Sequence, residues 1–329
     1  MKFNDEKILI TGAAGFIGSN LAHYFDKNYK NTKVLALDIF RTGETFSNGN
    51  LKSFGHFKNL KGFSGEIVQA DITKPEFLKI LKKFKPDIIF HLAAISDTTV
   101  LDQAVMIETN LNTFKPLLEY CRKNGAKLIY ASSAATYGDA KVPQTVWECE
   151  NPNNVYGFSK LSMDYMALKY IEKGVHVVGL RYFNVYGERE YFKNTTASMV
   201  LQFGHQILAG KEPKLFEGSD KIFRDFVYIK DVISANIKSV FTKKCGVYNV
   251  ATGKPRSFQD IVDILQKELD TNYKCQYIKN PHKAYQYFTQ ANMQESKEYL
   301  DFEAKYTLEE GIKEYIPEIK RLYKEEVDV

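Results

Sequence analysis

The chain has 329 residues, of which 44% are hydrophobic and 26% are charged. This size and hydrophobic content suffice to bury a large core, in one large domain or two moderate ones. The net charge of +5 comes from 45 basic and 40 acidic residues that are scattered along the chain. No basic block typical of a nucleic-acid or membrane surface is present, nor a signal peptide or a run of about 18 apolar residues. We therefore expect a cytoplasmic protein that binds neither nucleic acid nor membrane.

The cysteines and histidines do not indicate a metal site. Four cysteines, at positions 121, 149, 245 and 275, lack the close pairing of zinc ligands, and the six histidines form no HExxH motif. The sequence predicts no metal and no disulfide.

A glycine-rich turn follows the first apolar segment. Residues 7–11 form a short apolar run, as in a strand that is buried on both faces of a parallel sheet. Gly12, Gly15 and Gly18 come next at intervals of three, and a helical pattern follows from Ser19. Glycines at such a turn let a pyrophosphate approach the backbone N–H groups of the helix. The spacing alone also fits a simple tight turn, but its place between strand and helix favours a dinucleotide site.

A second apolar strand, residues 33–37, ends at Asp38, twenty positions after Gly18. An acidic residue at this distance is placed to meet the adenosine ribose and favours a free 2′-hydroxyl. Arg41 and the loop that contains Lys52 and Lys58 follow, and their charges could neutralise a 2′-phosphate. The residues alone leave NAD and NADP open.

Strands and helices alternate through the first half of the chain. Further strands are predicted at 66–70, 86–91, 126–131 and 176–181, with helices at 75–84, 111–121 and 155–172. This alternation predicts an α/β fold with a doubly wound parallel sheet of the Rossmann type. We expect an NADP-binding domain over 1–187, with a strand near 226–250 that returns to it, and a smaller mixed C-terminal substrate lobe over 188–329.

A serine, a tyrosine and a lysine are placed for proton transfer. Tyr156 and Lys160 are four residues apart, so a helix presents them on one face. A cation beside a tyrosine stabilises its phenolate and lowers a pKa that is ordinarily about 10. Ser133 follows the fifth strand and could hold the substrate oxygen. Alone, the YxxxK spacing also arises by chance, so the order of the other motifs is needed to support it.

That order resembles the short-chain dehydrogenase/reductase superfamily, in particular its extended branch, which acts mostly on nucleotide sugars. Within the branch, motifs spread over essentially the whole chain resemble the ADP-L-glycero-D-manno-heptose 6-epimerase family. They lie at residues 131–138, 154–160, 181–187, 214–219, 224–228 and 288–291. The motifs of the last third matter most, because every relative shares the Rossmann ones.

The resemblance implies an isomerase with a tightly held NADP. Such an enzyme oxidises the C6″ alcohol of ADP-glycero-manno-heptose, reorients the intermediate and reduces it from the opposite face, which supplies heptose for lipopolysaccharide core. A nicotinamide is needed because no side chain accepts a hydride. The family uses two bases, matched here by Tyr156 and Lys193, with Ser133 on the reacting oxygen and Lys160 on the nicotinamide ribose. Without the family, Lys193 is one of 45 basic residues and reads as a surface charge. The resemblance also implies a homo-oligomer.

Matching by position also assigns binding residues. The cofactor would contact Gly12, Gly15, Phe16, Ile17, Gly18, Asp38, Ile39, Arg41, Asp71, Ile72, Leu92, Ala93, Ala94, Ile95, Ser96, Asn110, Lys160 and Val185. The substrate would contact Asn184, Thr195, Gln202, Phe216, Glu217, Gly218, Ser219, Arg224 and Tyr285. The planar fork of Arg224 suits a diphosphate. An internal ion pair with Asp225 is the alternative role for that arginine.

Four departures and three competing functions bear on this interpretation. The family has a polar residue at Ile39, a serine at Thr195 and a histidine at Gln202, and the loop at 46–65 is longer here.

A sugar-nucleotide 4,6-dehydratase would carry an acid pair where Ala134 and Ala135 stand. A UDP-hexose 4-epimerase would not need Lys193. A non-catalytic NADP sensor would usually have lost the tyrosine or the lysine.

Overall fold

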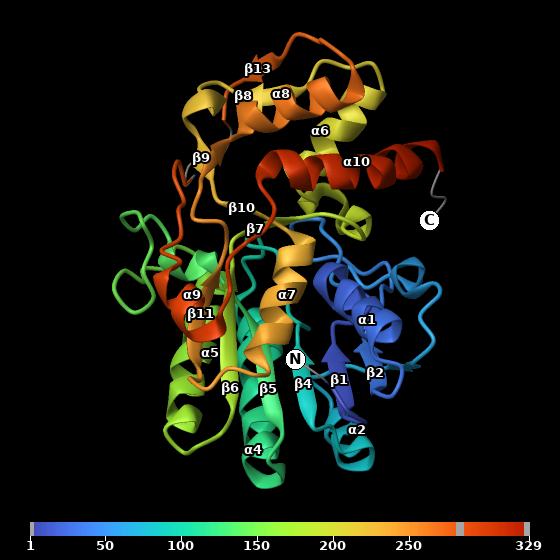
Figure 1. The fold of residues 1–329 in the computed structure, drawn as a ribbon, viewed down its shortest axis with the longest axis vertical. Coiled ribbons are helices and arrows are strands. Elements are labelled where there is room, and N and C mark those ends of the chain that lie inside the picture. Colours follow the sequence, from blue (N-terminus) through green and yellow to red (C-terminus); the bar gives the residue numbers. More distant parts are fainter. Residues whose placement is uncertain (1–2, 281–285, 326–329) are drawn as a thin grey trace.

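A computed structural model describes residues 3–280 and 286–325, and its centre is a parallel sheet of seven strands (Figure 1). The strand order is β11-β6-β5-β4-β1-β2-β3. The bounds are β1 (Lys7–Thr11), β2 (Lys33–Asp38), β3 (Glu66–Gln69), β4 (Ile88–His91), β5 (Lys127–Ser133), β6 (Val177–Tyr182) and β11 (Gly246–Val250). The prediction of a doubly wound Rossmann-type sheet is confirmed.

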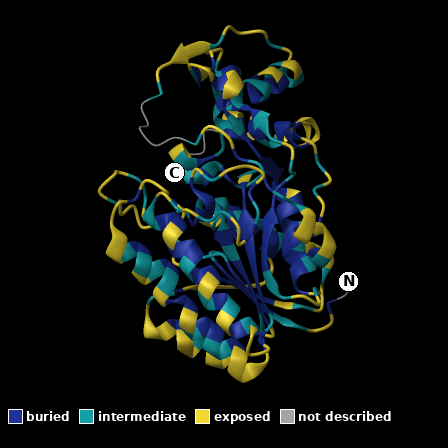
Figure 2. Ribbon diagram, turned by 90° about the vertical axis from the view of Figure 1, so that its left-hand side faces the viewer, coloured by how far each residue is buried: buried dark blue, intermediate teal, exposed yellow. Residues whose placement is uncertain are grey.

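Helices cover both faces of the sheet. Side chains of a strand point alternately to its two faces, and on β1 Ile8 and Ile10 belong to one core cluster whereas Leu9 belongs to another. The first cluster includes α1 (Phe16–Asn28) and α7 (Ile229–Ser239), and the second includes α2 (Pro75–Phe84), α4 (Phe114–Asn124) and α5 (Val155–Ile171). Figure 2 shows the strands buried between layers whose outer surfaces are exposed. In the described part of the chain, no helix is long and apolar enough to cross a membrane.

The C-terminal part adds small sheets and helices beside the carboxyl ends of the strands (Figure 1). Its three two-stranded sheets pair β10 with β7, β12 with β9 and β13 with β8. Their bounds are β7 (Asn184–Tyr186), β8 (Lys214–Phe216), β9 (Phe223–Arg224), β10 (Phe226–Tyr228), β12 (Arg256–Ser257) and β13 (Gln276–Ile278). The accompanying helices are α6 (Met199–Leu208), α8 (Phe258–Leu269), α9 (Gln294–Leu300) and α10 (Leu308–Lys324). β11 pairs in parallel with β6, so the chain does return to the central sheet, as expected.

Two predicted helices differ from the structure in their bounds. α1 begins at Phe16, inside the glycine motif, because the glycine turn itself forms the start of the helix. Where a helix was expected over 111–121, the helical segment begins earlier and has three parts, which are α3 (Gln103–Ile107), a π-helical turn over Glu108–Asn112, and α4. Such turns re-aim one side chain and are frequent at functional sites. Here the turn carries Asn110.

The packing of α10 on β7 depends on a glycine. A Cβ added to Gly311 would lie 2.0 Å from the Tyr186 hydroxyl oxygen. We expect Gly311→Ala to lower the free energy of unfolding by about 1 kcal/mol net, since overpacking costs about 1–3 kcal/mol and helix propensity returns up to about 1 kcal/mol. Urea unfolding measures this loss.

Two further variants control that measurement. Lys313→Ala, at an exposed position of the same helix, should change stability by no more than about 0.5 kcal/mol. Adding Tyr186→Phe to Gly311→Ala should recover part of the loss, because it removes the nearest atom. A fully stable Gly311→Ala protein would contradict the close packing of α10.

Candidate active site

The segments around the turn after β1 pack closely because Gly12 and Gly18 have no side chains. Gly12 has a φ of +69°, and a Cβ there would lie 2.7 Å from the backbone nitrogen of Ala93. A Cβ on Gly18 would lie 2.2 Å from the Gly12 carbonyl oxygen. Side chains at either position would therefore push apart β1, α1 and the loop after β4.

The N-terminus of α1 fits an anionic group. Gly15 is the N-cap, and among the described residues no side chain caps the helix and no acidic residue stands in its first turn. The first N–H groups and the positive end of the helix dipole thus face the turn. The residues of the turn therefore fit the pyrophosphate of a dinucleotide.

Asp38, at the end of β2, fastens the glycine turn to the next strand. Its carboxylate accepts hydrogen bonds from the backbone N–H groups of Ala14 at 2.9 Å and Phe40 at 2.8 Å. Burial raises the pKa of Asp38, and these N–H groups act in the opposite direction. Its place beside the turn is the one expected of a ribose ligand, and the ribose contact stays a prediction.

Arg41 contacts the segment that carries Lys193. Its Nη2 donates to the Phe192 carbonyl oxygen at 2.5 Å, and its guanidinium lies 5.7 Å from the centre of the Phe192 ring. The His56 ring stacks on the Phe192 ring, with the two ring centres 3.6 Å apart. Burial lowers the pKa of His56 to about 4, so this ring is uncharged. The loop after β2 therefore holds the Lys193 segment.

Asn110 connects the loop after β4 to α5. Its side-chain amide accepts a hydrogen bond from the Ile95 N–H at 2.8 Å and donates to the Ile95 carbonyl at 3.0 Å. The same amide nitrogen donates to the Ser159 hydroxyl at 3.1 Å. Asn110 thus shapes the loop of small residues, from Leu92 to Ser96, at the carboxyl end of β4.

The other predicted cofactor residues lie around the same end of the sheet. Ile17 is on α1, exposed Ile39 follows β2, and Asp71 and Ile72 follow β3. Val185 is on β7. The structure therefore places the predicted cofactor residues at strand ends or on α1, apart from Asn110 on the π-helical turn, Lys160 on α5, and Val185 on β7.

Ser133, Tyr156 and Lys160 come together between β5 and α5. Asn154 caps the N-terminus of α5 with its side chain, which fixes where the helix begins and which face it turns inward. The Ser133 hydroxyl is hydrogen-bonded to the Tyr156 phenol. The Lys160 ammonium lies 5.8 Å from the centre of the Tyr156 ring and donates to the Ala131 carbonyl at 2.9 Å. The three predicted side chains thus form one buried cluster.

The electrostatics of the cluster differ from the expectation for Tyr156. Burial raises the pKa of the phenol, and the Ser133 hydrogen bond opposes that rise. Burial also lowers the pKa of Lys160 to about 8, with Asp164 acting in the opposite direction. The prediction that Lys160 brings the pKa of Tyr156 below its ordinary value is wrong for the protein by itself, because burial outweighs it.

Lys193 reaches the site from a separate segment. It is half-buried in a 3₁₀ helix over Tyr191–Thr196 that is kinked at Asn194, and its ammonium lies 5.7 Å from the centre of the Phe16 ring. Phe16 begins α1, so Lys193 points toward the dinucleotide turn. Burial lowers the pKa of Lys193, and Glu190 acts in the opposite direction. A lowered pKa enlarges the uncharged fraction that can accept a proton.

Glu190 holds the Lys193 segment and was not found from the sequence. Its carboxylate is fully buried and accepts hydrogen bonds from the Gly187 N–H at 3.1 Å and from the Ser198 N–H at 2.6 Å and hydroxyl at 2.7 Å. A buried acid beside a basic residue has no pattern in the sequence that separates it from surface charges.

The predicted substrate residues belong to the C-terminal part and to β7. Asn184 is the first residue of β7, and the Gln202 amide on α6 donates to the Ala197 carbonyl at 2.7 Å. Thr195 approaches Asn50 of the long loop, with 3.4 Å between the two side-chain oxygens. Phe216, Glu217, Gly218 and Ser219 run from β8 into the turn that follows it.

Arg224 is buried, and its guanidinium donates to backbone carbonyls of Phe223 at 2.9 Å and of Gln286. The carboxylate of Asp225 accepts from Thr252, Gly253 and Ala291, so no ion pair between the two neighbours is formed in the described residues. Tyr285 lies outside the described residues.

The fold and this site define a class of dinucleotide-dependent α/β enzymes, in which a glycine turn and a Ser-Tyr-Lys cluster lie at the carboxyl ends of the parallel strands. Residues 8–251 match the model of the NAD dependent epimerase/dehydratase family. The chain belongs to this family.

Solved structures of epimerases resemble the chain over nearly its whole length. The ADP-L-glycero-D-manno-heptose-6-epimerase of Helicobacter pylori is 48% identical, covers 96% of this chain and 97% of its own, and has a TM-score of 0.88. A UDP-N-acetylglucosamine 4-epimerase of Methanobrevibacter ruminantium is 27% identical over 97% and 100% of the two chains, with a TM-score of 0.85. The UDP-glucose 4-epimerase of Thermotoga maritima is 28% identical over 96% and 99%, with a TM-score of 0.85.

The glycine turn gives a test of cofactor binding. Gly12→Ala should cause the purified protein to lose its bound nucleotide, because the added methyl group meets the backbone of Ala93. The measurement is the amount of nucleotide released by denaturation per mole of protein. Gly43→Ala is the matched control, since Gly43 also has a positive φ, of +86°, but nothing lies within 4 Å of its Cβ position. Equal nucleotide content in both variants would contradict the site.

Proposed function

We propose that the chain epimerises ADP-glycero-manno-heptose at C6″, from the D-glycero to the L-glycero form, and so supplies heptose for lipopolysaccharide core. The observation that carries this proposal is the 48% identity with the H. pylori enzyme over 96% of the chain. A match of 96% must include most of residues 188–329, which we infer to bind the sugar nucleotide. The UDP-sugar epimerases share the fold at similar TM-scores but only 27–28% of residues.

The residues of the site suit an inversion that proceeds by oxidation and reduction. The nicotinamide supplies the acceptor and donor of the hydride. Ser133 holds the reacting oxygen, and Tyr156 takes its proton on one face of the carbon. Lys193, on a separate segment, transfers the proton on the other face, for which its lowered pKa is suited.

We infer that NADP is the cofactor, so the nucleotide released in the Gly12 experiment should carry a 2′-phosphate. Arg41 and the lysines of the following loop provide positive charge near the end of β2.

We also infer that Arg224 contacts the diphosphate of the substrate, since its buried guanidinium is held in the C-terminal part. A homo-oligomer is expected, and sedimentation of the purified chain tests it.

Turnover of two substrates decides between heptose and hexose chemistry. The protein, incubated with ADP-D-glycero-D-manno-heptose, should convert it to the C6″ epimer, which NMR detects. UDP-galactose should stay unchanged under the same conditions. Turnover of UDP-galactose without turnover of the heptose would overturn the proposed substrate.

Two variants test the two bases. Tyr156→Phe and Lys193→Met should each lower kcat by a factor of about 10²–10⁴, the usual contribution of a positioned acid or base. Both proteins should keep their bound nucleotide, because neither substitution changes the glycine turn.

Lys211→Met, at an exposed position, is the matched lysine control and should keep full activity. Near-normal activity of Lys193→Met would remove the second base from the proposal.

A further inference from the structure

Asp164 lies on α5 one helical turn beyond Lys160 and two turns beyond Tyr156, on the same face. Its side chain is fully buried. The proposed chemistry gives this carboxylate no task, yet a buried charge is costly unless it is paired and hydrogen-bonded.

The partners of Asp164 are arranged for the ionised form. Its Oδ1 accepts from the Tyr130 hydroxyl at 2.8 Å, and its Oδ2 accepts from the Ser132 hydroxyl at 2.9 Å and from Arg181 Nε at 2.9 Å. A protonated acid would have to donate one hydrogen bond, whereas all three partners donate to it. Burial raises the pKa of Asp164, and these three donors oppose the rise.

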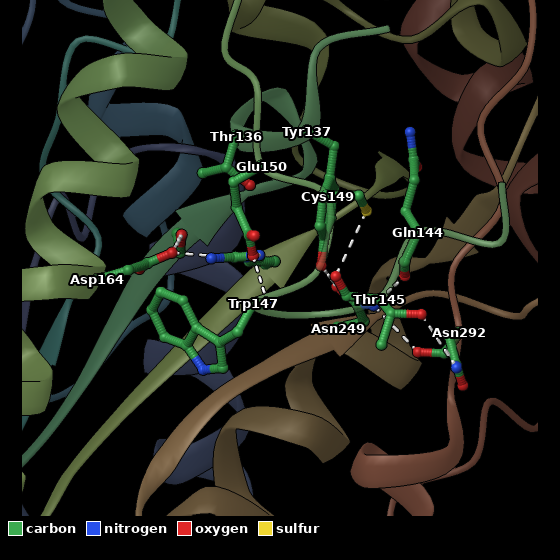
Figure 3. A network of polar contacts seen from close by, with 12 residues as sticks. Thr136, Tyr137, Gln144, Thr145, Trp147, Cys149, Glu150, Asp164, Asn249 and Asn292 are labelled. Atoms are coloured by element: carbon green, nitrogen blue, oxygen red, sulfur yellow. Dashed lines mark hydrogen bonds and ion pairs between the residues drawn. The ribbon is translucent and has the colours of Figure 1, made fainter. Parts of the chain in front are cut away.

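Arg181 also contacts a second acid. Its Nη1 is paired with Glu150, from the loop before α5, and its guanidinium lies 5.1 Å from the centre of the Trp147 ring. Figure 3 shows the side chains of Asp164, at the left, and Glu150, from above, directed toward the same part of the network. The single positive charge of Arg181 can neutralise the negative charge of only one of the two carboxylates. Lys160, one helical turn before Asp164 on the same face of α5, is a further buried positive charge.

The groups around Lys160 come from four elements. Tyr156 and Asp164 share α5 with it, and the Ala131 carbonyl on β5 accepts its hydrogen bond. His91 on β4 is uncharged, because burial lowers its pKa to about 3. Arg181 on β6 is held on the far side of Asp164 by its pairing with that carboxylate. Of the groups named here, Asp164 is the one that favours a charged Lys160.

We propose that Asp164 is a positioning residue whose buried carboxylate keeps Lys160 protonated and in place beside Tyr156. The proposal rests on the proposed function in that Lys160 supports Tyr156. Without Asp164, the ammonium is a buried cation with no counter-charge, so it releases its proton at lower pH. Tyr156 then loses the cation that stabilises its phenolate.

The pH profile of kcat/KM for ADP-D-glycero-D-manno-heptose tests this role. Loss of the Lys160 proton should end activity at alkaline pH, and Asp164→Asn should move this alkaline limb down by about one pH unit. Glu150→Gln is the matched control, since it also removes one acid from Arg181, but Glu150 is not among the groups that act on the pKa of Lys160. Its alkaline limb should stay where it is in the unaltered protein. Equal shifts in the two variants, or none in either, would overturn the proposal.

A second measurement decides the case without substrate, even where Asp164→Asn folds poorly. The double variant Asp164→Asn with Lys160→Met should melt at a higher temperature than Asp164→Asn alone, because the uncompensated cation is gone. A merely structural role of Asp164 in holding Arg181 predicts no such recovery, and its absence would overturn the proposal. Failure of the heptose substrate would leave this comparison unaffected, so the two failures can be told apart.

Discussion

The burial of one ammonium group, that of Lys160, constrains the whole site. The group needs a fixed acceptor and a nearby negative charge, and it finds them in the Ala131 carbonyl and in Asp164. These requirements tie β5 to α5 and fix the register of the helix. Tyr156 then lies beside the Ser133 hydroxyl at the carboxyl edge of the sheet. The parallel sheet supplies this edge, and the glycine turn of β1 opens onto it as well.

The position of Lys193, the proposed second base, depends on contacts between residues that are far apart in the sequence. Lys193 lies in a short kinked helix. Glu190 accepts a hydrogen bond from Ser198 just after this helix. Arg41 and His56 contact Phe192 within it. The position of this segment therefore depends both on the loop after β2 and on the chain after β7. These contacts connect the loop after β2 to the proposed second base.

The sequence was sufficient for the sheet and for local motifs, because both follow from short-range patterns. Apolar strands, the glycine turn and the Tyr156–Lys160 spacing are each visible within a few residues, and the returning strand was expected. The buried pairing of Asp164 with Arg181 was not predictable, since it joins a helix to a strand and looks like ordinary surface charge. The rise in the pKa of Tyr156 was missed for a related reason, because burial depends on the complete fold.

The central claim is that inversion proceeds by hydride removal and return at C6″. Substrate that carries deuterium at C6″, turned over in ordinary water, tests it most directly by mass spectrometry of the product. The account predicts that the product keeps its deuterium at C6″, since the same hydride returns to the same carbon. Loss of the label to solvent would contradict the account, because it would mean that C6″ is deprotonated rather than oxidised.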